Sequence, residues 1–168
     1  MAALDKDVIH AETMPLMDLF DAGNIAQRAM EKRLSHLGLS VAQQRIITLV
    51  YLANESLTPS GLAALLLQET HSVSGLLNRL EDRELITRFR DKRDRRVVWV
   101  GLSGDGQTMA EKAIEVAREI SRELAPVLSR ARGNRAIEAL RAARDIGFKI
   151  AGVKEEVRRE ALRRVWGK

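Results

Sequence analysis

The stretch from residue 70 to residue 102 changes its hydrophobic period, and this change limits the folds that the chain can adopt. Its first part places apolar residues at the i, i+3, i+4 and i+7 positions of a helix, namely Val73, Leu76, Leu77 and Leu80. Its second part holds two runs rich in β-branched and aromatic residues around an all-charged tip at 91–96. The sequence therefore predicts a helix beginning near Ser72, followed by a two-stranded hairpin.

Helix signals precede this unit. A first apolar face leads to a helix that ends at Gly38, because glycine favours the left-handed turn that closes a helix. Ser40 and Gln43 have the spacing of a capping box, and Thr58 followed by Pro59 is typical of a helix start. Three helices followed by a hairpin form a winged helix-turn-helix domain, so we predict a mostly α fold with a small β-hairpin.

Long helices are expected after the hairpin. Ser103 caps one that runs to about residue 129, and Pro126 is expected to kink it or end it early. After a stop at Gly133-Asn134, a last helix runs to about residue 165. The apolar residues of this last helix are Ile137, Leu140, Ile146, Ile150, Val157, Leu162 and Val165. A single winged domain cannot cover so much apolar surface, so these helices and the first one should pack on something else.

Composition excludes several classes of protein. Cysteine is absent, which excludes disulfides, a thiolate zinc site and a cysteine redox sensor. Aromatic residues make up only 4%, which disfavours single-strand binders that stack bases on aromatic side chains. No apolar run is long enough to span a membrane, and the first residues lack a secretory signal, so we expect a soluble, cytoplasmic protein.

Neither metal nor catalytic chemistry is indicated. The histidines His10, His36 and His71 are scattered without metal-ligand spacing. No set of nucleophile, base and orienting residue can be assembled from the sequence. We therefore expect no metal, no cofactor and no enzymatic activity, with a regulatory metal site assembled across a dimer as the alternative.

The positive charge lies in two blocks. Residues 71–100 hold eight basic and five acidic residues, and residues 130–168 hold twelve and five, within a chain of net charge +5. Such clustering favours an anionic polymer as partner. The alternative, above all for the second block, is a set of solvated basic helix faces.

The outer face of the helix that follows residue 70 suits DNA recognition. This face carries small or hydrogen-bonding residues and no acid, namely Ser72, Ser74, Gly75, Asn78 and Arg79. A helix enters the major groove only if its outer face is slim and can bond to base edges. The alternative is an ordinary amphipathic surface helix.

The hairpin tip supports the same interpretation. Asp91 and Asp94 cannot pair with all of the neighbouring cations, which are Lys92, Arg93, Arg95 and Arg96. Each acid can tether one arginine and stiffen the tip, while the remaining charges project toward a minor groove. A charged turn that only keeps a sheet edge soluble is the alternative.

These motifs together resemble the MarR family of bacterial transcription regulators. The resemblance rests on residues 72–81, on Leu85-Ile86-Thr87-Arg88, on Asp91-x-x-Asp94-Arg95-Arg96 and on Leu102-Ser103-x-x-Gly106. It implies a homodimer with a winged domain at 39–102 and a helical dimerisation region at 1–38 and 103–168. Glu84 departs from the pattern, because relatives usually carry glycine just after the recognition helix.

The resemblance also implies contacts for each element. Ser72, Ser74, Asn78 and Arg79 fall where the family reads bases or backbone, and the wing-tip arginines fall at the wing contact. Thr58 and Ser60 begin the helix before the turn, where backbone phosphates are often held. The expected partner is an inverted repeat in double-stranded DNA, with one half-site for each protomer.

We therefore expect a dimeric, sequence-specific regulator, a repressor that a small molecule releases from DNA. The effector implied by the resemblance is an aromatic acid or thioester at the junction of the first, second and fifth helices. His36 and Arg45 are its polar candidates, unless both are satisfied structurally. The alternatives are an effector-independent architectural or antisilencing protein and a winged-helix adaptor between proteins.

Overall fold

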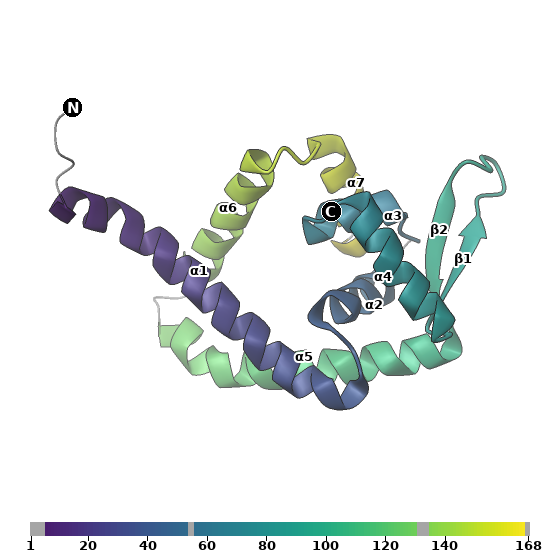
Figure 1. Ribbon diagram of the computed structural model, residues 1–168, viewed down its shortest axis with the longest axis horizontal. Coiled ribbons are helices and arrows are strands. Elements are labelled where there is room, and N and C mark those ends of the chain that lie inside the picture. Colours follow the sequence, from purple (N-terminus) through teal and green to yellow (C-terminus); the bar gives the residue numbers. More distant parts are fainter. Residues whose placement is uncertain (1–5, 54–55, 131–134, 167–168) are drawn as a thin grey trace.

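A computed structural model describes residues 6–53, 56–130 and 135–166 of the chain (Figure 1). The elements, in order, are α1 (Lys6–Leu34), a 3-10 turn η1 (Ser35–Leu37), α2 (Val41–Leu52), α3 (Pro59–Leu66), α4 (Thr70–Asp82), β1 (Ile86–Arg90), β2 (Val98–Leu102), α5 (Gly104–Arg130), α6 (Arg135–Ile150) and α7 (Glu155–Trp166). The expected mostly helical fold with one small hairpin is confirmed.

The winged domain is built around one apolar core. Helices α2, α3 and α4 contribute Ile46, Leu62 and Leu77, all fully buried, and the hairpin contributes Val100. Strands β1 and β2 pair antiparallel, with Phe89 opposite Trp99. Leu57 forms an isolated β-bridge with β2, in which its carbonyl accepts a hydrogen bond of 2.9 Å from the Val100 amide. The sequence indicated the hairpin but not this bridge.

The capping signals act as predicted. Ser40 and Gln43 form a reciprocal capping box at the start of α2. The Thr58 hydroxyl accepts a hydrogen bond from the Gly61 amide at the start of α3. Gly38 closes the first helical segment with a φ of +63°. Local side chain–backbone bonds of this kind depend on a few neighbouring residues, which is why the sequence alone reveals them.

Two boundaries differ from the prediction. Helix α4 begins at Thr70, two residues before the expected start, with Glu69 as its N-cap residue. By contrast, helix α5 ends at Arg130, close to the expected end near residue 129, and it does not end early at Pro126. The expected last helix is two helices, because Gly152 adopts a φ of +68° and its amide bonds back to the Lys149 carbonyl. The expected break at Gly133-Asn134 and the side chain of Ile137 lie outside the described residues.

Gly106 fixes the start of α5 against the hairpin. A Cβ atom at this position would lie 1.7 Å from the carbonyl oxygen of Leu85. Ser103 completes the junction, since its hydroxyl accepts a hydrogen bond of 2.9 Å from the Gly106 amide. The motif of a leucine and serine followed by glycine at 102–106 therefore joins the wing to the long helix.

The remaining helices form a frame around the winged domain. Arg33 of α1 forms ion pairs with Glu119 and Glu123 of α5, which fasten these two helices together. Figure 1 shows α6 rising away from α5, after which α7 turns back toward α3 and the hairpin. Ala161 and Val165 of α7 are buried in the same core as the winged domain.

Candidate nucleic-acid interface

Helix α4 presents the predicted outer face. Its buried residues are Val73, Leu77 and Leu80, so its apolar stripe faces the core. Ser72, Asn78 and Arg79 are exposed, whereas Ser74 and Gly75 are half-buried. A Cβ at Gly75 would have no neighbour within 4 Å, so glycine is not required there by packing. Its effect is to keep this face of the helix slim.

Arg88 of β1 holds Asn78 in place, a role that the sequence analysis missed. Nη2 of Arg88 donates a hydrogen bond of 2.7 Å to Oδ1 of Asn78 and lies 3.5 Å from the Ser74 carbonyl. Its Nε is 3.6 Å from a carboxylate oxygen of Glu81. The alternation of β1 offers a signal, because Arg88 shares the face of the buried Ile86 and so points toward α4. With Oδ1 occupied, the Asn78 amide group is free to donate to a base.

The two acids of the wing bind backbone amides rather than arginine side chains. Oδ1 of Asp91 accepts hydrogen bonds from the amides of Arg93 and Asp94, at 2.7 and 2.9 Å, and Oδ2 accepts one of 2.9 Å from the Trp99 indole. These donors lower the pKa of Asp91, with the Asp94 amide contributing most, then Trp99 and Arg93. Asp94 likewise accepts a hydrogen bond of 3.0 Å from the Arg96 amide, so both acids bind the backbone of the turn, and the expected tethers to arginine side chains are not found in the described structure.

Because both acids bind backbone amides, the basic side chains of the tip have no carboxylate partner in the described structure. The side chains of Lys92, Arg93, Arg95 and Arg96 are exposed, and within the described parts of the chain they form no ion pair. Four cations without an ion-pair partner, set against the carboxylates of Asp91 and Asp94, leave a net charge of +2 on residues 91–96 of this narrow two-stranded ribbon and make the local potential positive.

The start of α3 is less open than the sequence suggested. Thr58 is half-buried, and its hydroxyl lies 3.1 Å from that of the exposed Ser60. Helix α7 lies alongside, and Glu156 and Glu160 line a cavity of about 310 Å³ together with Thr58. Both hydroxyls remain candidates for phosphate contacts, but carboxylates stand next to one of them.

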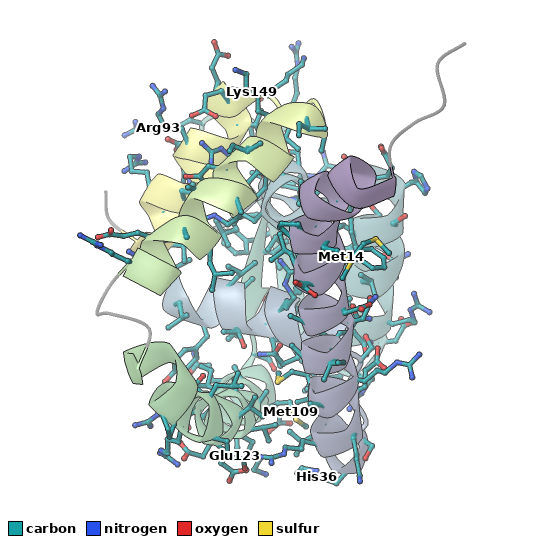
Figure 2. All side chains as sticks on the ribbon, turned by 90° about the vertical axis from the view of Figure 1, so that its left-hand side faces the viewer. Met14, His36, Arg93, Met109, Glu123 and Lys149 are labelled. Carbon is teal, nitrogen blue, oxygen red and sulfur yellow. The ribbon has the colours of Figure 1, made fainter. Side chains whose placement is uncertain are left out.

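No hydrogen bond joins His36 and Arg45 in the described structure. His36 is exposed on η1, and Figure 2 shows it at the lower end of the molecule, far from Arg93 of the wing. Nη2 of Arg45 lies 3.5 Å from the carbonyl of Leu65 in the last turn of α3. A cavity of about 430 Å³ lies between α2, β2 and α5, lined by residues that include Tyr51 and Gln107 but neither candidate.

The helix-to-strand turn after α4 adopts the conformation that favours glycine. Glu84 has a φ of +57°, and its carbonyl accepts a hydrogen bond from the Ser103 hydroxyl. Glutamate therefore occupies the left-handed position for which the resemblance suggested glycine. The turn geometry is retained in spite of the side chain.

Two kinds of feature are missing from the described residues. None of their helices combines the length and hydrophobicity that crossing a bilayer requires. They also contain no group of three histidine, aspartate or glutamate residues arranged to hold a metal ion.

Solved structures share this fold. AbsC, a MarR family transcriptional regulator from Streptomyces coelicolor, matches 90% of this chain and 99% of its own with a TM-score of 0.73 and 19% identity. MepR from Staphylococcus aureus, in complex with DNA, matches 78% of this chain and 96% of its own at a TM-score of 0.68 and 23% identity. CouR from Rhodococcus jostii, bound to p-coumaroyl-CoA, matches 79% of this chain and 88% of its own at a TM-score of 0.66 and 22% identity.

A search of curated proteins gives no match. The model of the MarR family matches residues 37–97, from the end of the first helical segment to the tip of the wing. This range contains α2, α3, the recognition-like helix α4 and β1. Residues 37–97 of this chain therefore match the MarR family model, and they lie within a winged helix-turn-helix fold.

Proposed function

We propose that this protein is a dimeric, sequence-specific regulator of transcription that acts on double-stranded DNA in the cytoplasm, and not an enzyme. One observation carries the proposal: four cations of the wing are exposed and form no ion pair in the described structure, beside a slim helix face without acids. In this arrangement α4 reads base edges in a major groove. The wing tip binds in the adjacent minor groove, where the negative potential is concentrated. The DNA-bound fold of MepR supports this assignment.

The dimer is supported by apolar surface that the single chain leaves uncovered. Ten of the fifteen exposed large hydrophobic residues in the described structure lie on α1, α5 and α6, and they are Met14, Leu16, Met17, Leu19, Phe20, Ile25, Leu124, Leu140, Ile146 and Ile150. Ile150 is 82% exposed. Patches of this kind on long helices mark protein–protein interfaces. A second copy of the chain would place two α4 helices on successive major grooves of an inverted repeat.

The dimer can be tested without disturbing the fold of one chain. Phe20→Glu and Ile150→Glu alter side chains that are exposed in the protomer, so each should leave the helical content intact. We expect sedimentation to show a dimer for the native chain and a shift toward monomer for these variants. Lys32→Ala, at an exposed position of α1, should stay dimeric. A native chain that sediments as a monomer would refute the dimer.

We also propose that a small molecule releases the protein from DNA, so that it acts as a repressor. CouR, with the same fold, holds a coenzyme A thioester, which supports an aromatic acid or thioester as effector. His36 and Arg45 stay the polar candidates for this site, and the guanidinium of Arg45 could pair with an acid group. A tenfold release of DNA needs a difference in effector affinity of about 1.4 kcal/mol between the two states.

A salt titration on duplex DNA tests the central proposal. If about 6–10 phosphates are contacted, affinity should fall by roughly 10³–10⁵ between about 50 and 200 mM salt. The same titration with phenolic acids and their coenzyme A thioesters tests the effector. A salt-dependent response that no effector changes favours the architectural alternative, whereas a flat response to salt favours the protein adaptor.

A further inference from the structure

Helix α7 places part of the basic C-terminal block directly against the winged domain. Ala161 packs beside Gly61 of α3, where a Cβ at Gly61 would lie 3.6 Å from that of Ala161. Ala161 and Val165 are almost fully buried in the shared core. The helix is therefore part of the domain that faces DNA, although the resemblance assigned residues 103–168 to dimerisation.

Arg164 is the residue by which α7 holds the wing. Its guanidinium carbon lies 4.7 Å from the centre of the Trp99 ring, a cation–π contact. Its Nη1 donates a hydrogen bond of 3.2 Å to the Ser56 carbonyl, and its Nε donates one of 2.8 Å to Glu160. The side chain is only 20% exposed. These contacts fix the guanidinium in one position.

Trp99 connects Arg164 to the tip of the wing. Its indole donates to Oδ2 of Asp91, and Oδ1 of the same carboxylate accepts the amides of Arg93 and Asp94. A continuous set of contacts therefore runs from α7, through one ring and one carboxylate, to the backbone that carries the tip cations. A two-stranded ribbon has little stability of its own in water, so its direction depends on such supports.

We propose that α7 is a positioning element for the wing: the contact of Arg164 with Trp99 sets the direction in which the wing cations meet DNA. The proposal rests on the proposed DNA binding but concerns a different residue and a different helix.

The test compares two neighbouring arginines. Arg164→Gln removes the cation over Trp99, whereas Arg163→Gln removes the same charge one residue earlier, from a side chain that pairs with Glu160. In amide relaxation measurements on the free protein, we expect Arg164→Gln to increase the mobility of residues 91–96 and Arg163→Gln to leave it unchanged. DNA affinity should fall about tenfold for Arg164→Gln and stay within about twofold for Arg163→Gln.

A combination with the wing variant separates positioning from a direct phosphate contact. In a background with Lys92, Arg93, Arg95 and Arg96 all changed to alanine, the wing has lost its cations, so Arg164→Gln should cause no further loss of affinity. If Arg164→Gln fails to fold, Trp99→Phe takes its place in the test. This variant keeps a ring but removes the donor to Asp91, so it should increase the mobility of the same residues, 91–96. Unchanged wing mobility, or losses of affinity that multiply, would overturn the proposal. If the proposed DNA binding by the wing is itself wrong, the wing variants alone will leave DNA affinity unchanged, and this outcome is distinct from the two above.

Discussion

The carboxamide oxygen of Asn78 accepts a hydrogen bond of 2.7 Å from Nη2 of Arg88. This bond links the recognition-like helix α4 to β1, the first strand of the wing. The same guanidinium lies 3.6 Å from Glu81, one turn further along the helix. The two elements that we assign to neighbouring grooves are thus joined by one side chain. Asn78 is exposed, and its Oδ1 already accepts a hydrogen bond, so its amide nitrogen is the group left to donate.

This geometry predicts that Asn78 reads a base as a donor. Asn78→Ala should weaken binding to the preferred site by about 1–3 kcal/mol and relax the preference at one position of each half-site. Titrations on the preferred duplex and on duplexes changed at single base pairs measure both effects. A loss that is equal on every duplex would instead assign Asn78 to the backbone.

Wing variants should behave differently. Arg95→Ala and Arg96→Ala each remove an exposed cation without an ion pair in the described structure, so each should weaken binding to all sequences alike. The slope of log affinity against log salt should fall by about one for each variant. Lys32→Ala, on α1, is the matched control and should leave the slope unchanged. A relaxed base preference from the wing variants would mean that helix and wing have exchanged roles.

Glu84 carries backbone strain that a single substitution can remove. A non-glycine residue at a φ of +57° has about 1–3 kcal/mol of backbone strain, which glycine would remove. Glycine also makes the unfolded chain more flexible, which lowers stability by less than about 1 kcal/mol. Glu84→Gly should therefore raise the free energy of unfolding by about 1 kcal/mol. Urea denaturation measures the change, and Glu84→Ala, which keeps the Cβ, should bring no gain. A less stable glycine variant would contradict the strain argument.

The sequence predicts those parts of the fold that depend on neighbouring residues. The capping box at Ser40, the proline start of α3 and the period change at the hairpin all rest on local rules, and all are present. Glycine within a helical pattern is more ambiguous. Gly147 stays inside α6, whereas Gly152 ends it, and the periodicity of the two segments does not distinguish them.

Contacts between distant segments could not be read from the sequence. Arg164 and Trp99 belong to no shared motif, and they meet only because α7 folds back over α3. The role of Asp91 was missed for a related reason. Its charge suggested an arginine partner, but the tight turn places backbone amides closer, and an aspartate satisfies such amides readily.

Gly106 is expected to be essential for folding. An alanine Cβ would lie 1.7 Å from the carbonyl oxygen of Leu85, and backbone cannot move away as a flexible side chain can. Gly106→Ala should lower the free energy of unfolding by about 3 kcal/mol or more. Gly104→Ala is the matched control, because its Cβ would meet nothing within 4 Å, and its stability should be unchanged or up to about 1 kcal/mol higher. Equal effects of the two variants on the free energy of unfolding would show that Gly106 is not in close contact with the Leu85 carbonyl.

The Asp91 carboxylate should keep the wing ordered to unusually low pH. Its pKa lies below the ordinary value, mainly because the Asp94 amide, the Trp99 indole and the Arg93 amide donate to the charged form. A group with a lowered folded pKa stabilises the fold above its unfolded pKa, about 3.9, and loses this effect as the pH falls through the folded value. The Trp99 indole proton, assigned by its absence in Trp99→Phe, should therefore shift with a midpoint below 3.9. In Asp91→Asn the same proton should show no such titration, because an amide replaces the carboxylate. A midpoint at or above 3.9 in the native chain would mean that these three donors do not hold the carboxylate in solution.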